Sequence, residues 1–141
     1  MSTLRAHADP QALFQRQIDC IQRDDRETQL QLYAEDCVYE FPFAVDRPRR
    51  LSSREEIRRV MTPMWEEARR RGARVTGCDT LVHVTMDPEV IVAEFTLAVE
   101  ARGSASRIDF VQVLRARQNR IAQVREYFSP GARSSILDSQ P

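Results

Sequence analysis

The hydrophobic pattern of this chain changes its period at Gly72. Before this glycine, apolar residues recur every three or four positions, which is the spacing of a helix that buries one face. After it come four runs rich in β-branched and aromatic residues, at about 74–86, 89–101, 106–117 and 120–129. The breaks between these runs are short enough for hairpins. Helices followed by an antiparallel meander predict an α+β fold.

Local signals predict three helices in the first half of the chain. Asp9 and Pro10 suit the N-cap and the first turn of a helix. Capping-box patterns at 24–27 and 52–55 predict the starts of a second and a third helix. The third helix has the clearest apolar stripe, made of Ile57, Val60, Met61, Met64, Trp65 and Ala68. Pro63 lies inside this helix and should kink it.

A fifth strand is expected between the second and third helices, where residues 37–43 are rich in strand formers. Pro42 indicates that this strand ends there or lies at the edge of the sheet. The length suits a single domain over residues 1–141, with an ordered core of about 10–130. We therefore expect three N-terminal helices packed on a curved, mainly antiparallel sheet.

The composition argues against several classes of function. Twenty-one arginines balance 21 acidic residues, so no net charge attracts nucleic acid or an anionic membrane. The chain has no lysine, which excludes Schiff-base catalysis by a lysine and suggests a bacterial origin. Cys20, Cys37 and Cys78 are far apart, and no apolar run approaches the ~20 residues that span a bilayer, so a cytoplasmic protein is expected. Zinc-binding spacings and phosphate-binding loops are absent, so we expect no metal or cofactor.

Two segments resemble those of a known superfamily. Residues 33–43, where Tyr-Ala-Glu-Asp precedes Tyr-Glu-Phe-Pro-Phe, and residues 120–130 are similar to the signatures of nuclear-transport-factor-2-like proteins. The similarity is greatest to the SnoaL-like and ketosteroid-isomerase-like branch, and it covers about residues 10–130. It implies a cone-shaped barrel with a pocket for a small hydrophobic molecule. This fold hosts cyclases, isomerases, dehydratases, epoxide hydrolases and non-enzymatic binding proteins.

The resemblance carries over to two individual positions. Ketosteroid isomerases have a general-base aspartate just before the proline of the first strand, and the matching position here is Phe41, so that base is absent. Relatives from phenazine biosynthesis use a glutamate in an Arg-Glu-aromatic motif, which matches Arg125, Glu126 and Tyr127. The resemblance therefore implies a catalytic role for Glu126.

Hairpin geometry predicts which polar side chains meet. If residues 118–119 form a two-residue turn, Glu126 lies opposite Val111 and shares its face of the sheet. The same arithmetic for the other hairpins gives this face a polar set: Asp79, His83, Glu94, Thr96, Asp109 and Glu126. Neighbouring buried carboxylates have separated pKa values and can act as an acid–base pair. The candidate catalytic residues are therefore Glu126, Asp109 and His83.

The residues expected to line a pocket are mostly aromatic or apolar: Tyr33, Tyr39, Phe41, Met61, Trp65, Val111 and Phe128. The first functional hypothesis is a cofactor-independent cyclase, isomerase or dehydratase that acts by acid–base catalysis on a polyketide-like or other hydrophobic carbonyl compound. The alternative is a non-catalytic ligand-binding or accessory protein, or a module for interaction alone. In that case the carboxylates lie on a solvated face and pair with arginines such as Arg115.

A homodimer is the expected partner arrangement, formed through the outer face of the sheet. The argument is that the face with Phe95, Leu97 and Val99 holds more apolar surface than a monomer usually leaves in water. Apart from a second copy and a small hydrophobic ligand, no nucleic acid or membrane partner is expected.

Overall fold

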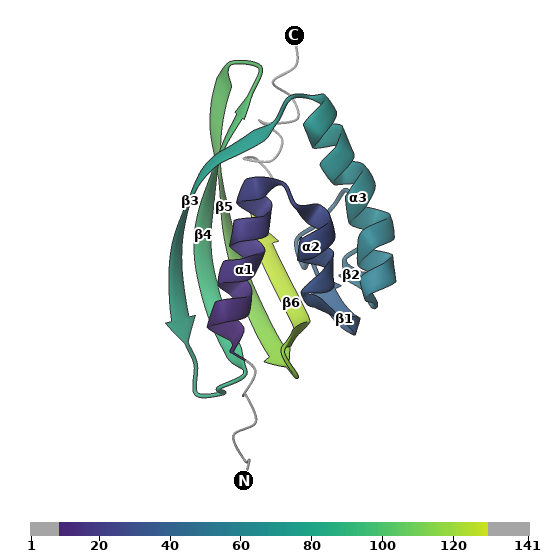
Figure 1. The fold of residues 1–141 in the computed structure, drawn as a ribbon, viewed down its shortest axis with the longest axis vertical. Coiled ribbons are helices and arrows are strands. Elements are labelled where there is room, and N and C mark those ends of the chain that lie inside the picture. Colours follow the sequence, from purple (N-terminus) through teal and green to yellow (C-terminus); the bar gives the residue numbers. More distant parts are fainter. Residues whose placement is uncertain (1–8, 130–141) are drawn as a thin grey trace.

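The computed structural model describes residues 9–129, which form three helices and one six-stranded sheet (Figure 1). The helices are α1 (Pro10–Arg23), α2 (Arg26–Gln31) and α3 (Arg54–Arg70). The strands are β1 (Tyr33–Glu40), β2 (Arg50–Leu51), β3 (Arg74–Val84), β4 (Val90–Ala101), β5 (Ser104–Arg117) and β6 (Arg120–Phe128). The predicted α+β class is confirmed. Residues 1–8 and 130–141 of the predicted domain lie outside the described range.

The first two helices begin at side-chain caps. The Asp9 carboxylate accepts hydrogen bonds from the backbone N–H groups of Gln11 and Ala12, at 3.1 and 3.2 Å. The N-cap of α2 is Asp25, one residue later than predicted. Asp24 is not available for this role because it has a left-handed conformation, with φ of 55°, and ends α1.

α3 also begins one residue later than predicted. The Ser53 hydroxyl accepts a hydrogen bond from the N–H of Glu56 at 3.0 Å, and the Glu56 carboxylate accepts one from the N–H of Ser52 at 2.6 Å. The helix then continues through Pro63. Within its apolar stripe only Ile57 is fully buried, so the middle of α3 stands off from the sheet rather than packing tightly on it.

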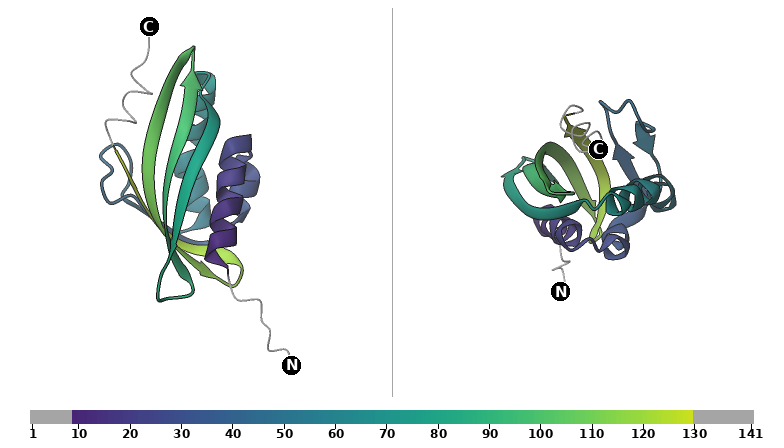
Figure 2. Two further views of the ribbon diagram at one scale, coloured as in Figure 1. Left: turned by 90° about the vertical axis from the view of Figure 1, so that its left-hand side faces the viewer. Right: turned by 90° about the horizontal axis from the view of Figure 1, so that it is seen from above.

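The sheet has the strand order β2-β1-β6-β5-β4-β3. Neighbouring strands are antiparallel except β1 and β6, which are parallel and bring the first and last strands of the sequence side by side. The sheet is open, with β2 and β3 at its edges, and the predicted cone-shaped barrel is not confirmed. The three helices lie on the same side of the curved sheet (Figure 2).

An extra residue in β6 decides which of its side chains face the helices. The predicted turn at 118–119 is present, with positive φ at both residues. Ala122 then has no partner on β5, so the pairing slips by one position. Beyond this bulge, Glu126 pairs with Gln112 and not with Val111, as the unbroken hairpin predicted. A slip of one residue turns every later side chain to the opposite face, so Glu126 points toward the helices.

The other two hairpins preserve the predicted faces. The β4–β5 turn is at residues 102–103, one position earlier than predicted. The partner of each β4 residue on β5 is therefore two positions away from the predicted one. Because side chains alternate between faces, a shift of two keeps the face, and Thr96 still shares a face with Asp109, its direct partner. In the β3–β4 hairpin, His83 lies opposite Val92, as the arithmetic predicted.

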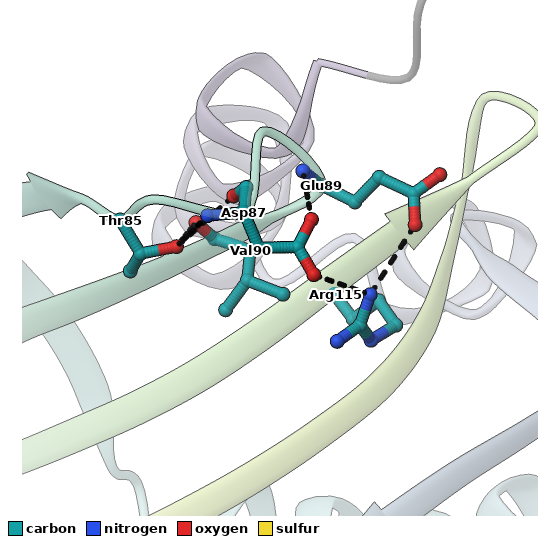
Figure 3. A network of polar contacts seen from close by, with 5 residues as sticks. All are labelled: Thr85, Asp87, Glu89, Val90 and Arg115. Atoms are coloured by element: carbon teal, nitrogen blue, oxygen red, sulfur yellow. Dashed lines mark hydrogen bonds and ion pairs between the residues drawn. The ribbon is translucent and has the colours of Figure 1, made fainter.

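The loop between β3 and β4 is held by a local polar network (Figure 3). The Thr85 hydroxyl lies 3.0 and 2.9 Å from the backbone carbonyls of Asp87 and Val90. Arg115 of β5 donates to the carboxylates of Asp87 and Glu89, at 3.0 and 3.2 Å. Arg115 therefore stabilises a hairpin end, and does not pair with the carboxylates on the sheet face as the alternative hypothesis proposed.

The helix-covered face of the sheet carries the apolar core. Phe95, Leu97 and Val99 are buried on this face, and the ring of Phe95 lies 5.4 Å from that of Phe14 in α1. The argument for a dimer assumed that this face met water, so that argument is wrong, while the homodimer itself stays a prediction. Within residues 9–129, no helix is long and apolar enough to cross a membrane.

Candidate active site

A cavity of about 220 Å³ lies between α3 and the helix-covered face of the sheet. Most of its wall is apolar and comes from α3 and the three strands β4 to β6: Ile57, Met61, Met64, Trp65, Ala68, Phe95, Leu97, Ile108, Phe110 and Phe128. Its polar lining consists of Arg26, Gln29, Tyr33, Tyr39, Arg47 and Glu126. An apolar chamber with a few convergent polar groups is typical of small-molecule sites.

Glu126 is the acidic residue in the wall of this cavity. Only 8% of its surface is exposed, and burial raises the pKa of its carboxyl group. Two hydrogen bonds oppose this rise: Gln112 donates from Nε2 at 2.7 Å and Tyr39 donates from its hydroxyl at 2.8 Å. Both reach Oε1, and within residues 9–129 no hydrogen bond reaches Oε2. The second oxygen is therefore the one that can meet a ligand.

A chain of buried side chains supports the carboxylate from behind. Gln112 accepts a hydrogen bond from Gln17 at 2.9 Å, and Gln17 accepts one from the Tyr33 hydroxyl at 2.9 Å. Gln29 donates to the Tyr33 hydroxyl at 3.1 Å, and Arg26 donates to Gln29 at 2.9 Å. In this series of hydrogen bonds, each donor points toward the Glu126 carboxylate. The network therefore fixes the position of the carboxylate and favours negative charge on it.

The two tyrosines of the cavity already have hydrogen-bond partners. Burial raises the pKa of Tyr33 and of Tyr39, and the neighbouring Glu126 adds to the rise for Tyr39. Both hydroxyls therefore keep their protons at neutral pH. In this arrangement each donates within the network, one to Gln17 and the other to Glu126, and not toward the space of the cavity.

The structure brings together six of the ten residues predicted for the site. Glu126 lines the cavity together with Tyr33, Tyr39, Met61, Trp65 and Phe128. Phe41 is buried directly behind, with its ring 4.8 Å from that of Tyr39. Val111 lies on the outer face of the sheet, because its partner on β4 is Glu94 and its partner on β6 is Tyr127.

The other two predicted catalytic residues, Asp109 and His83, are on that outer face as well. The Asp109 carboxylate is exposed and accepts a hydrogen bond from Thr96 at 2.6 Å. His83 is exposed and lies 2.6 Å from the carboxylate of Glu94. The prediction that these groups share a face with Glu126 is wrong, because the bulge at Ala122 reverses only the last strand.

Sequence reasoning missed Gln112, Gln17 and Arg47. Gln112 left a signal, since it interrupts the apolar alternation of β5 between Phe110 and Leu114 on the buried face. A glutamine at such a position must find a buried partner. Gln17 lies on the buried side of α1 in the same way. Arg47 left no such signal in the sequence, because it lies in an irregular loop.

The described residues hold no group of three or more histidine, cysteine or acidic side chains that could bind a metal ion. Cys37 is buried, and burial raises the pKa of its thiol to about 12. A thiol with that pKa carries almost no thiolate at neutral pH, so Cys37 is a structural residue and not a nucleophile. Among the residues that line the cavity, Glu126 is the carboxylic acid.

The described residues thus combine an α+β fold with an apolar cavity that has the buried carboxylate of Glu126 in its wall. Residues 14–124 match the SnoaL-like domain. The chain belongs to this family, as the resemblance implied. No curated protein sequence gives a significant match.

Solved structures show the same fold. A Bacillus subtilis protein provisionally assigned as an isomerase has a TM-score of 0.77 at 17% identity, with 94% of each chain covered. An LEH-like epoxide hydrolase from Mycobacterium tuberculosis has a TM-score of 0.64 at 17% identity, covering 93% of this chain and 90% of that one. A second M. tuberculosis protein, solved in complex with estradiol-17β-hemisuccinate, has a TM-score of 0.69 at 22% identity, covering 89% and 97%. At these identities the likeness concerns the fold alone.

Proposed function

We propose that the protein is a cofactor-independent enzyme that uses Glu126 as a general base on a small, hydrophobic carbonyl compound. The observation that carries the proposal is the Glu126 carboxylate in the wall of an apolar cavity. Its Oε1 accepts two hydrogen bonds, whereas its Oε2 accepts none from residues 9–129. A base whose pKa is raised toward neutrality is well matched to abstracting a proton from carbon beside a carbonyl.

The proposed first step breaks a C–H bond next to the carbonyl of the substrate. The proton passes to Oε2 of Glu126, and the electron pair moves onto the carbonyl oxygen as an enolate. Once Glu126 is neutral, the hydrogen bond from Tyr39 is no longer charge-assisted, so the Tyr39 hydroxyl can turn to the enolate oxygen. Return of the proton to another carbon isomerises the substrate. Alternatively, attack of the enolate on a second carbonyl carbon closes a ring, and the alkoxide that forms takes the proton back from Glu126. In a substrate with a β-hydroxyl, the enolate expels that group, which takes the proton from Glu126 and leaves as water.

A second candidate is a binding protein with the same pocket and no chemistry. It is favoured by the completeness of the polar network, in which the hydroxyls of Tyr33 and Tyr39 and both functional ends of Gln112 are already bonded to protein groups. A pocket built in this way can hold an apolar ligand rigidly without acting on it.

The two candidates are separated by one series of measurements. Trp65 is the only tryptophan of the chain and lines the cavity, so its fluorescence reports binding directly. Apolar ketones and diketones that change this fluorescence are then tested for turnover by mass spectrometry. With any substrate found, Glu126→Gln is expected to lower kcat by about 10²-fold or more, because it removes the proton acceptor and keeps the shape.

Asp109→Asn is the matched control, since it makes the same chemical change on the opposite face of the sheet. It is expected to leave kcat at the wild-type value. Full activity in Glu126→Gln would remove Glu126 from the mechanism. Binding without turnover of any compound would favour the second candidate.

A further inference from the structure

Arg47 is a buried cation at the wall of the cavity. It lies in the loop between β1 and β2, and only 6% of its side chain is exposed. Its guanidinium carbon is 4.8 Å from the centre of the Phe41 ring and 5.1 Å from that of Phe128. These two aromatic contacts hold the flat group in place and contribute favourable cation–π energy.

The hydrogen bonds of this guanidinium are incomplete. Nε donates to the carboxylate of Asp46 at 3.2 Å. The two terminal nitrogens carry four further N–H groups, and within residues 9–129 none of these makes a hydrogen bond. Buried donors without acceptors are unfavourable, so a ligand acceptor that binds them gains more than it would at a surface.

The other arginine of the cavity differs in this respect. Arg26 donates from Nε to Asp24 at 3.2 Å and from Nη1 to Gln29 at 2.9 Å, while it stacks on Trp65. Both arginines are paired with an aspartate, Arg26 with Asp24 and Arg47 with Asp46. The terminal N–H groups of Arg47, and not the net charge of the cavity wall, therefore point to an anionic ligand.

We propose that Arg47 binds a carboxylate of the ligand, so that the molecule this cavity takes has an apolar body and one anionic end. The two terminal nitrogens of a guanidinium match the two oxygens of a carboxylate in a paired, charge-assisted contact. The apolar body then lies against Trp65 and Phe110. This inference rests on the pocket of the proposed function and narrows its substrate class to hydrophobic keto acids.

The competing explanation is that Arg47 only fastens the loop by packing between two rings. The two explanations predict the same loop structure but different preferences for the ligand. A fastening residue gives no preference between a charged ligand and a neutral one of the same shape. An anion-binding residue does.

Calorimetric titration of the full chain with matched ligands tests this directly. ω-Phenyl carboxylates from phenylacetate to 6-phenylhexanoate are compared with their primary amides, which have the same shape and no charge. The wild type is expected to bind the best carboxylate about tenfold or more tightly than its amide, as a charge-assisted contact predicts. Arg47→Gln should bring the carboxylate down to the affinity of the amide.

Arg50→Gln is the matched control. It removes the same charge from an exposed position three residues away that pairs with Glu40, and it should keep the full preference for the carboxylate. If Arg47→Gln does not fold, Arg47→Lys serves instead, and it should retain a reduced preference because the charge stays and the paired geometry is lost.

Equal binding of acid and amide by the wild type would overturn the proposal. So would a preserved preference for the carboxylate in Arg47→Gln, or the finding that no carboxylate of the series binds the wild type with a Kd below about 1 mM. The readout involves no turnover, and Glu126→Gln should keep a preference for the carboxylate, because Arg47 is intact and a negative charge has been removed from the same cavity. Failure of the catalytic proposal and failure of this one are therefore distinct results.

Discussion

Glu126 differs from the other acidic residues in how its charge is held. On the surface, carboxylates meet arginines directly, as Glu27 does with Arg58 at 2.9 Å. Within residues 9–129, no arginine lies within ion-pair distance of Glu126, and its two hydrogen bonds come from the neutral donors Gln112 and Tyr39. Neutral donors fix the geometry but offset less of the penalty of burying a charge. This is why its pKa is raised although the carboxylate is well hydrogen-bonded.

The raised pKa of Glu126 predicts a characteristic pH dependence of stability. The folded protein holds the proton of Glu126 to higher pH than the unfolded chain does. Its contribution to stability is therefore complete below the ordinary pKa of a glutamate and is lost as the pH rises through the folded value. Glu126→Gln stays neutral at every pH, so the variant should gain free energy of unfolding relative to the wild type as the pH rises from about 4 to 8.

Urea unfolding of both proteins across this range measures the difference. Glu100→Gln, an exposed residue on β4, serves as the control and should follow the wild type at each pH. A relative stability of Glu126→Gln that falls with pH would mean that the pKa of Glu126 is lowered in the folded state.

At the scale of elements, the local sequence predicted the bounds of the helices and long strands, because local interactions determine where these elements begin and end. Side-chain caps, glycines and hairpin turns act over three or four residues, so the helices and the four long strands lie within a few residues of their expected bounds. The bulge at Ala122 is different, because it is a feature of how β6 pairs with β5 and not of a local turn or cap. Nothing in the local sequence marks it, and it alone moved Glu126 from the predicted face to the cavity.

The same difference between local and distant interactions explains which residues of the site could be predicted from the sequence. Tyr39 and Trp65 were predicted to line a pocket because the helix and strand patterns place them on inward faces. Arg47 was not predicted, because its position depends on packing between Phe41 and Phe128, and Phe128 is distant from it in the sequence.

The loose packing of α3 predicts unequal protection from hydrogen exchange. Phe14 and Ile18 of α1 are completely or almost completely buried, whereas most of the apolar stripe of α3 faces the cavity and is only partly covered. Segments with few buried apolar contacts open more readily. The amides of α3 should therefore exchange faster than those of α1, and a ligand bound in the cavity should slow α3 while leaving α1 unchanged. Equal protection of both helices without ligand would contradict this.

At the scale of the whole molecule, the three helices lie on one face of the sheet, and within residues 9–129 no helix covers the other face (Figure 2). The outer face and its margin expose apolar side chains, with Leu81 57% and Phe43 61% exposed beside the partly buried Val111 and Tyr127. An open, partly apolar sheet face is suited to contact with a second copy. The homodimer is therefore predicted on this face, and not on the apolar face that the helices cover.

Light scattering at micromolar concentration should give a particle of about twice the 16.3 kDa chain mass. Val111→Glu places a charge on the outer face, away from the cavity, and is expected to shift the particle toward the mass of one chain. Thr76→Glu, at the exposed end of β3, is a control that should leave the mass unchanged. A wild-type particle of one chain would exclude the dimer.

The parallel contact of β1 with β6 has a consequence for synthesis. Tyr39 and Glu126 are hydrogen-bonded partners separated by 87 positions, and β6, which completes the sheet, is the last of the described strands to be synthesised. Until β6 emerges, β1 and β5 have no shared neighbour, and the helices have only part of a surface to cover. Contacts this distant in sequence form late and slow the overall folding rate. A nascent chain thus lacks the part of the cavity wall that carries Glu126 and Phe128 until β6 is made, and a copy that ends before β6 would carry the helices but an incomplete cavity.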